Sequence, residues 1–225
     1  MKVFVFNFFI FLSIVFVKGE PVQKDVVVIT AYFPLGRSKH SEFEYKKWIN
    51  NFFHSVISKL FIFTQSNYVN ELKQIYINST TVKNPRFIEI EQDDDAEFHK
   101  VSAVEAHVVF ITAYSSPDKL PPVKTVKNDL ITWQHQIDPE KHIHSPELYM
   151  IWTSKPWFVR RISGLNIFKN KNTFYMWVDI GSRRTKYDFG PWPDAGTVQE
   201  SLREFNTSKP ILAAVSKNSR YLSND

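Results

Sequence analysis

The feature that most constrains this chain is an uninterrupted apolar run that ends at a carboxylate. Five large apolar residues occupy positions 174–178, and the polar residues that follow include Asp179, Gly181, Arg183 and Arg184. Such a run is typical of a strand buried on both faces of a parallel sheet. Ligands of open α/β sheets bind where the central strands end, and a lone carboxylate there needs a partner. Asp179 is therefore a candidate contact for a metal ion or an arginine; the alternative is that it only caps the following turn.

A second apolar run, at residues 26–33, begins a βαβ pattern. Its β-branched residues suit a central parallel strand. Ser41 and Glu44 have the spacing of a capping box, and apolar residues then recur at three- and four-residue steps as far as residue 57. A short apolar run at 60–64 completes the unit, whose crossover should be right-handed.

The remaining segments predict a three-layer α/β/α fold with a mostly parallel central sheet. Residues 108–111 suit either a strand or part of a helix, and Pro156 is expected to kink or divide the helix that contains it. Residues 25–225 are expected to form one domain that is incomplete at its C-terminal end. The further elements expected are strands at 86–91 and 210–215 and helices at 66–76, 130–137, 146–165 and 198–205.

Residues 1–19 predict a secretory signal peptide. Lys2 precedes an apolar stretch, and cleavage is expected after Gly19; an uncleaved anchor in a secretory membrane is the alternative. The sequons at Asn78 and Asn206 are consistent with glycosylation along this route. We therefore expect the protein outside the cell or in the lumen of the Golgi or endoplasmic reticulum, and at a membrane only if the anchor is kept.

The composition excludes several classes of protein. A hydrophobic fraction of 43% in 225 residues indicates a folded domain with a sizeable core. The absence of cysteine excludes disulfides and Cys-based zinc or thiol chemistry. Removal of the two lysines in residues 1–19 lowers the formal charge from +5 to +3, which is too mild to indicate nucleic acid. A small anionic ligand such as a nucleotide or phosphate remains compatible with this charge.

Cationic side chains are expected near the end of the first strand. The loop at residues 34–40 carries Arg37 and Lys39, and its amides and cations can take up a nucleotide; a plain cationic loop is the alternative. The loop is neither a G-x-G-x-x-G motif nor a P-loop, which disfavours dinucleotide and P-loop ligands. Lys155 lies within an apolar helical pattern. It is either buried, with a phosphate or an aspartate as its partner, or it lies at the surface with its aliphatic part packed down and its ammonium in water.

Two other clusters are weaker candidates. The acidic residues 93–95 contain a literal Asp-x-Asp after a strand, but polar residues precede them, which favours a solvated loop over a phosphatase or nuclease site. His142 and His144 lack an obvious third ligand for zinc. The sequence contains no G-x-S-x-G, no H-E-x-x-H and no cysteine nucleophile.

Several of these segments together resemble the HtrL/YibB family of glycosyltransferase-like proteins. The matching pieces follow the family's order across residues 26–184, with the middle unaligned, and the Trp-x-Asp-x-Gly piece is the most specific. The pieces are Val28-Ile29-Thr30-Ala31-Tyr32-Phe33 with Gly36-Arg37, Tyr45-x-x-Trp48, Leu60-Phe61-Ile62-Phe63-Thr64, Lys155-Pro156-x-Phe158-Val159 and Trp177-Val178-Asp179-Ile180-Gly181.

The resemblance implies a GT-A-like fold that binds a nucleotide-sugar at the carboxyl edge of the sheet. Asp179 then stands at the metal-binding motif of such enzymes, with Mn²⁺ or Mg²⁺ as cofactor, although Gly181 replaces the second acid of the usual Asp-x-Asp. On this basis Arg37 is expected near the nucleotide and Lys155 near the active cleft, and the other expected donor-binding residues are Thr30, Arg183 and Arg184.

We therefore expect a glycosyltransferase that moves a sugar from a nucleotide donor to a glycan or protein acceptor. The sequence identifies no catalytic base for this reaction. The alternative is a secreted, non-catalytic carbohydrate- or protein-binding module on the same fold, which Gly181 and the short segment after Asp179 both favour.

Overall fold

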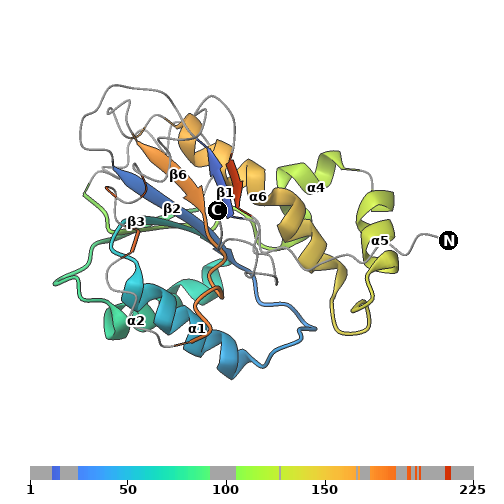
Figure 1. Cartoon of the computed structure of the whole chain (residues 1–225), viewed down its shortest axis with the longest axis horizontal. Helices are drawn as coiled ribbons and strands as arrows, with labels where there is room; N and C mark the ends of the chain where they lie inside the picture. The colour runs from blue at the N-terminus through green and yellow to red at the C-terminus, as the bar shows by residue number, and fades with distance from the viewer. Residues whose placement is uncertain are drawn as a thin grey trace, which may run out of the picture.

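A sheet of seven strands forms the centre of the part of the chain that the structure describes (Figure 1). The structure is a computed structural model, and it describes residues 12–15, 25–91, 105–126, 128–165, 167, 173–185, 192–193, 196, 198 and 211–213. The strand order is β4-β5-β3-β2-β6-β1-β7. The five mutually parallel strands are β2 (Val26–Tyr32), β3 (Lys59–Thr64), β4 (Phe87–Ile90), β5 (Val108–Ile111) and β6 (Phe174–Trp177).

The two remaining strands extend the sheet beyond β6. β1 (Leu12–Val15) pairs antiparallel with β6, and β7 (Ile211–Ala213) pairs antiparallel with β1. β1 lies within the segment interpreted as a signal peptide, and both the signal peptide and the anchor stay predictions. Among the described residues, no helix is long and apolar enough to span a bilayer.

Helices cover both faces of the sheet, and this confirms the predicted α/β architecture (Figure 1). α1 (Glu42–Ser55) and α2 (Val69–Ser79) pack on one face, together with the short η1 (Ser66–Tyr68). The other face carries η2 (Pro117–Lys119), α4 (Pro121–Thr125), α6 (Pro146–Gly164) and, packed on α6, α5 (Asn128–Ile137).

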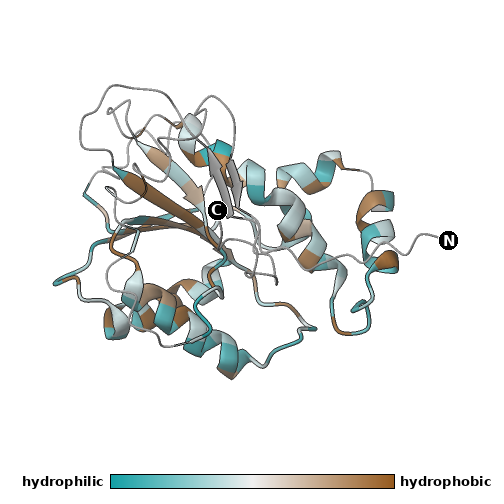
Figure 2. Cartoon of the chain, in the orientation of Figure 1, coloured by the Kyte–Doolittle hydropathy of each residue, from teal (hydrophilic) through white to brown (hydrophobic). Residues whose placement is uncertain are grey.

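The apolar runs become the strands because both faces of the sheet are covered. Strand side chains alternate between the two cores, so β2 gives Val28 to the α1–α2 side and Ile29 to the α6 side. β2 is accordingly one of the most hydrophobic segments among the described residues (Figure 2). Each fully buried Phe, such as Phe52 or Phe61, contributes about 2–3 kcal/mol, so this core supplies the stability that a chain without disulfides needs.

Local signals account for the two helices that border the site. The predicted capping box is present at the start of α1, where the Ser41 hydroxyl accepts the Glu44 amide at 3.2 Å and the Glu44 carboxylate accepts the Ser41 amide at 2.9 Å. Pro156 does not divide α6, which runs unbroken from residue 146 to 164. The proline lacks only the amide that would bond to the Trp152 carbonyl, and its ring is exposed.

Candidate functional site

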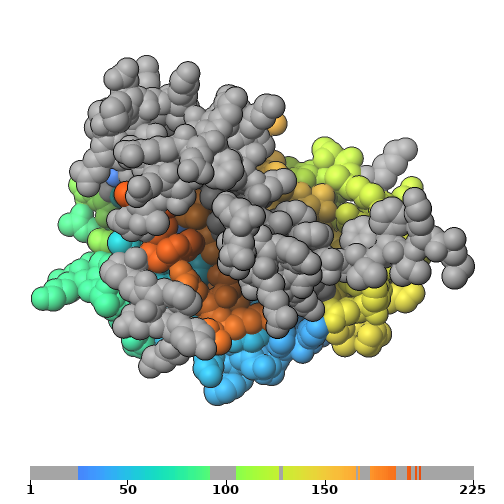
Figure 3. Space-filling model, in the orientation of Figure 1, coloured from blue at the N-terminus to red at the C-terminus, as the bar shows by residue number. Residues whose placement is uncertain are grey.

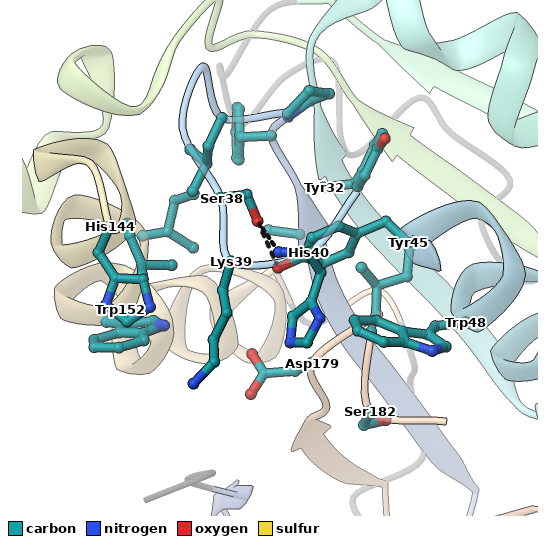
Figure 4. A pocket seen from close by; sticks show the side chains of 18 of the residues that line it. Tyr32, Ser38, Lys39, His40, Tyr45, Trp48, His144, Trp152, Asp179 and Ser182 are labelled. Carbon is teal, nitrogen blue, oxygen red and sulfur yellow. Dashed lines mark hydrogen bonds between the residues drawn. The ribbon is translucent and has the colours of Figure 1, made fainter. Parts of the chain in front are cut away.

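The neighbouring strands β2 and β6 end at the same edge of the sheet. Their register pairs Val26 with Phe174 and Ile29 with Trp177. The chain runs from β2 through α1 to β3, which pairs with one side of β2, whereas β6 pairs with the other side of β2. β2 and β6 therefore flank a topological switch point. A cavity of about 330 Å³ opens there, and its lining includes the loop after β2, the segment after β6 and residues of α1 and α6 (Figure 4).

An ion pair lies at the floor of this cavity. Lys155 Nζ of α6 lies 2.8 Å from Oδ1 and 2.9 Å from Oδ2 of Asp179, the first polar residue after β6. The indole Nε1–H of Trp177 donates to Asp179 Oδ1 at 3.2 Å. Lys155 is buried, while the carboxylate stays partly open to the cavity. The predicted need of both groups for a partner is therefore met within the chain.

The packing of α6 on the sheet fixes this pair. Phe158 and Ile162 of α6 are fully buried, and Lys155, three residues before Phe158, lies on the same helix face. The rings of Phe158 and Trp177 stack with centroids 5.2 Å apart and planes 12° from parallel. The Lys155 ammonium lies 5.7 Å from the Trp177 ring centroid, which adds a cation–π contact. A rigid apolar frame thus holds the two charges at the strand end.

One wall of the cavity is aromatic and comes from the start of α1. Tyr45 and Trp48 meet edge to face at 5.2 Å, and His40 meets Trp48 at 4.7 Å (Figure 4). The guanidinium of Arg184 lies 4.9 Å from the Trp48 ring centroid. A Cβ built on Gly181 would lie 3.4–3.5 Å from Tyr45 and Trp48, which is ordinary van der Waals contact, so this wall lies directly beside the segment after β6.

The segment after β6 is joined to α1 beyond the cavity as well. The Asn51 side-chain amide donates to the Arg183 carbonyl at 3.1 Å. In the space-filling view, residues that follow β6 (orange) lie against those of α1 (blue) (Figure 3). The position of Asp179 is therefore fixed from the α1 side as well as from α6.

The opposite wall comes from α6 and the turn before it. Its cavity-lining residues include His144, Ile151 and Trp152 (Figure 4). His144 is buried, and its Nδ1 lies 2.8 Å from Asp138 Oδ2, which also accepts a hydrogen bond from the Tyr149 hydroxyl. Burial alone would raise the pKa of Asp138. These hydrogen bonds outweigh burial and hold that pKa below its ordinary value. Burial raises the pKa of the Tyr149 hydroxyl, and the hydrogen bond to the charged Asp138 raises it further.

Cationic side chains surround the mouth of the cavity. The exposed Arg37 and Lys39 extend from the loop after β2, and the exposed Arg184 belongs to the segment after β6. Lys39 Nζ pairs with Glu140, which links this loop to the turn before α6. The cavity thus combines a zwitterionic floor, aromatic walls and a cationic rim.

Four of the six ligand-contact residues predicted from the sequence line the cavity: Arg37, Lys155, Asp179 and Arg184. Thr30 does not, because its side chain is fully buried in β2. Arg183 also lies outside the lining.

The Arg183 guanidinium lies 4.9 Å from the Trp192 ring centroid. Burial lowers the pKa of Arg183. Sequence reasoning did not select Trp152 or His144 for this cavity, and the only signal for the aromatic wall was the Tyr45-x-x-Trp48 spacing.

The described residues include no cluster of side chains that could enclose a metal ion without ligands from a bound substrate. No group of three or more His, Asp or Glu in this part of the chain could hold one. Asp179 has an ammonium against both oxygens, and His144 is engaged with Asp138 while His142 is exposed. Residues 93–95 and Asn206 lie outside the described residues. Mn²⁺ or Mg²⁺ at Asp179 therefore stays a prediction, and at this carboxylate a metal would compete with Lys155.

Comparison of the chain with protein-family models, with curated proteins and with solved structures finds no match. The resemblance to the HtrL/YibB family is therefore a prediction from the sequence motifs alone.

Proposed function

We propose that the protein is a glycosyltransferase that binds a nucleotide-sugar in this cavity and transfers the sugar to a glycan or protein acceptor. The fold would then be a GT-A-like member of the α/β class. The observation that carries the proposal is the Lys155–Asp179 pair at the floor of a cation-rimmed cavity, at the ends of β2 and β6.

Each part of a nucleotide-sugar has a chemical counterpart in the cavity. The diphosphate is an anion that the cations Arg37, Lys39 and Arg184 attract and hydrogen-bond. The partly open carboxylate of Asp179 can accept a hydrogen bond from a sugar hydroxyl. The half-buried Trp152 in the opposite wall offers apolar ring surface to a sugar or base ring.

The proposed reaction breaks the bond between the anomeric carbon and the diphosphate oxygen. The diphosphate leaves with the electron pair, and an acceptor hydroxyl forms the new bond and releases its proton. Fixed cations around the leaving group stabilise the negative charge that develops on it. The residue that takes the acceptor proton is not assigned.

A thermal-shift titration with UDP- and GDP-sugars, with and without manganese, tests the proposal. A ligand at 100 times its Kd stabilises the folded state by about 2.7 kcal/mol, which raises Tm by roughly 5–10 °C for a chain of this size. One nucleotide series should show this rise, and Arg37→Gln should reduce it. Nucleosides without phosphate are the matched ligand control, and a flat response to every donor would refute the proposal.

A non-catalytic binding module on the same fold is the second candidate. It is favoured by Gly181, which stands where a second acid would be expected, and by the pairing of Asp179 with a lysine. Such a module would bind a glycan or protein without any nucleotide. A Tm rise with free oligosaccharides but none with nucleotide-sugars would select it over the transferase.

The proposed site of action is the secretory pathway, on the basis of residues 1–19 and the sequons. Asn78 is exposed in the last turn of α2, where a glycan can be attached without disturbing the core. The acceptor would then be a glycan or protein in the same compartment.

A further inference from the structure

We infer that Lys155 takes the place of a divalent cation at this site, so that its ammonium meets the diphosphate and donor binding needs no metal. The inference rests on the proposed function and deepens it, because it names the charge that faces the leaving group. It also distinguishes two roles for Asp179, which either pairs with Lys155 or coordinates a metal ion.

The position of the ammonium is the first argument. Lys155 Nζ lies within 2.9 Å of both carboxylate oxygens of Asp179, and Trp177 donates to one of them. An ammonium group has three N–H donors, so the carboxylate leaves at least one donor for a further acceptor. Lys155 lines the cavity, and it thus has both the charge and the hydrogen for a phosphate oxygen.

The poor fit of a metal is the second argument. A hard divalent cation at a diphosphate needs at least one carboxylate oxygen that is free to coordinate it, beside the phosphate oxygens and waters. Here the carboxylate already has a fixed cation against both oxygens, and a second cation at Asp179 would lie next to that like charge. Displacing Lys155 is costly because α6 and the Phe158–Trp177 stack hold it buried.

The two roles of Asp179 predict opposite effects of one substitution. If Lys155 meets the diphosphate, Asp179 repels the same anion and competes for the ammonium. Asp179→Asn then removes the repulsion and keeps an oxygen beside Lys155, so the affinity for an inorganic diphosphate rises. If Asp179 instead holds a metal, the same substitution removes a ligand of the metal and lowers the affinity.

The experiment is calorimetric titration of the full chain with pyrophosphate in EDTA, because free divalent cations bind pyrophosphate tightly, and with the best nucleotide-sugar first in EDTA and then in Mn²⁺ or Mg²⁺. We expect wild-type Kd values for the nucleotide-sugar that agree within about threefold in the two media. Asp179→Asn should bind pyrophosphate about tenfold more tightly, and Lys155→Met at least tenfold more weakly, each about 1.4 kcal/mol. Lys59→Met is the matched control, because this half-buried lysine begins β3 at the opposite edge of the sheet.

Lys155→Gln serves as a second variant if Lys155→Met does not fold, as judged by circular dichroism. Wild-type binding of the nucleotide-sugar only with metal, or weaker pyrophosphate binding by Asp179→Asn, would overturn the inference and leave the proposed function standing. Unchanged affinity in both Lys155 variants would do the same. If no nucleotide-sugar binds in either medium, the proposed function itself fails, and the inference fails with it.

Discussion

The Lys155–Asp179 pair should respond unequally to the loss of its two members. The Lys155 side chain is only 8% exposed, whereas the Asp179 side chain is 32% exposed. Asp179→Asn leaves a buried ammonium without its counter-charge. Lys155→Met leaves a carboxylate that water can reach and that still accepts the Trp177 indole hydrogen bond. The aspartate variant should therefore be the less stable of the two.

Estimates of the two costs follow from this difference in exposure. Removing one member of a fully buried pair costs about 3–5 kcal/mol. The partial exposure of the pair and the remaining amide oxygen reduce this figure to about 2 kcal/mol for Asp179→Asn. Methionine fills the volume of the lysine stem, so Lys155→Met should cost less than about 1 kcal/mol. The double variant should regain most of the stability that Asp179→Asn loses, because no unpaired charge remains.

Urea denaturation of the wild type, both single variants and the double variant measures these differences as a double-mutant cycle. We expect a coupling free energy of about 1–2 kcal/mol between the two positions. Equal costs for the single variants, or a less stable Lys155→Met, would refute the reasoning from exposure. Additive costs in the double variant would show that the two charges do not interact.

Three further predictions concern other residues. Ser41→Ala should lower the free energy of unfolding by about 1 kcal/mol through the lost α1 cap, with nucleotide affinity unchanged within twofold by calorimetry. The pKa of Asp138 is lower in the folded state than in the unfolded state. Its ionised carboxylate therefore stabilises the folded state at pH values above the ordinary pKa near 4, and this contribution is lost as the pH falls through the folded-state pKa. The stability gap between wild type and Asp138→Asn should therefore narrow below about pH 4 in denaturation series, and a gap that widens there would contradict this sign. In protein expressed in eukaryotic cells with the Asn206 sequon removed, a glycosidase should lower the mass of the form that keeps Asn78 but not that of the Asn78→Gln variant.

The sequence was most informative where a pattern had one physical cause. The run at 174–178 is apolar at every position and the run at 26–33 is interrupted only by Thr30, and such runs are typical of strands covered on both faces. The capping box located the start of α1 for a similar reason, since its two hydrogen bonds are local. These local signals were sufficient for the α/β fold and for the edge of the sheet that carries the cavity.

The direction of single side chains was less predictable. Thr30 follows the alternation of β2 and points into the core beside Val28, although its neighbours Ala31 and Tyr32 line the cavity. Arg183 contacts Trp192 outside the cavity, whereas the adjacent Arg184 turns to Trp48. These outcomes depend on tertiary packing that a motif does not contain.

Long-range partners were also beyond the sequence. The sequence indicated that Asp179 needed a partner and left Lys155 either buried or at the surface, but their mutual contact requires α6 to pack against β6. The Asp138–His144 contact depends on the turn before α6, in the stretch with the weakest sequence pattern.

A structure of the protein with UDP or GDP, whichever nucleotide raises Tm more, tests the central claim most directly. The account predicts a diphosphate oxygen within hydrogen-bond distance of Lys155 Nζ, between the Arg37 loop and Arg184. A nucleotide bound elsewhere on the surface, or one in the cavity whose phosphates turn away from that ammonium, would contradict it.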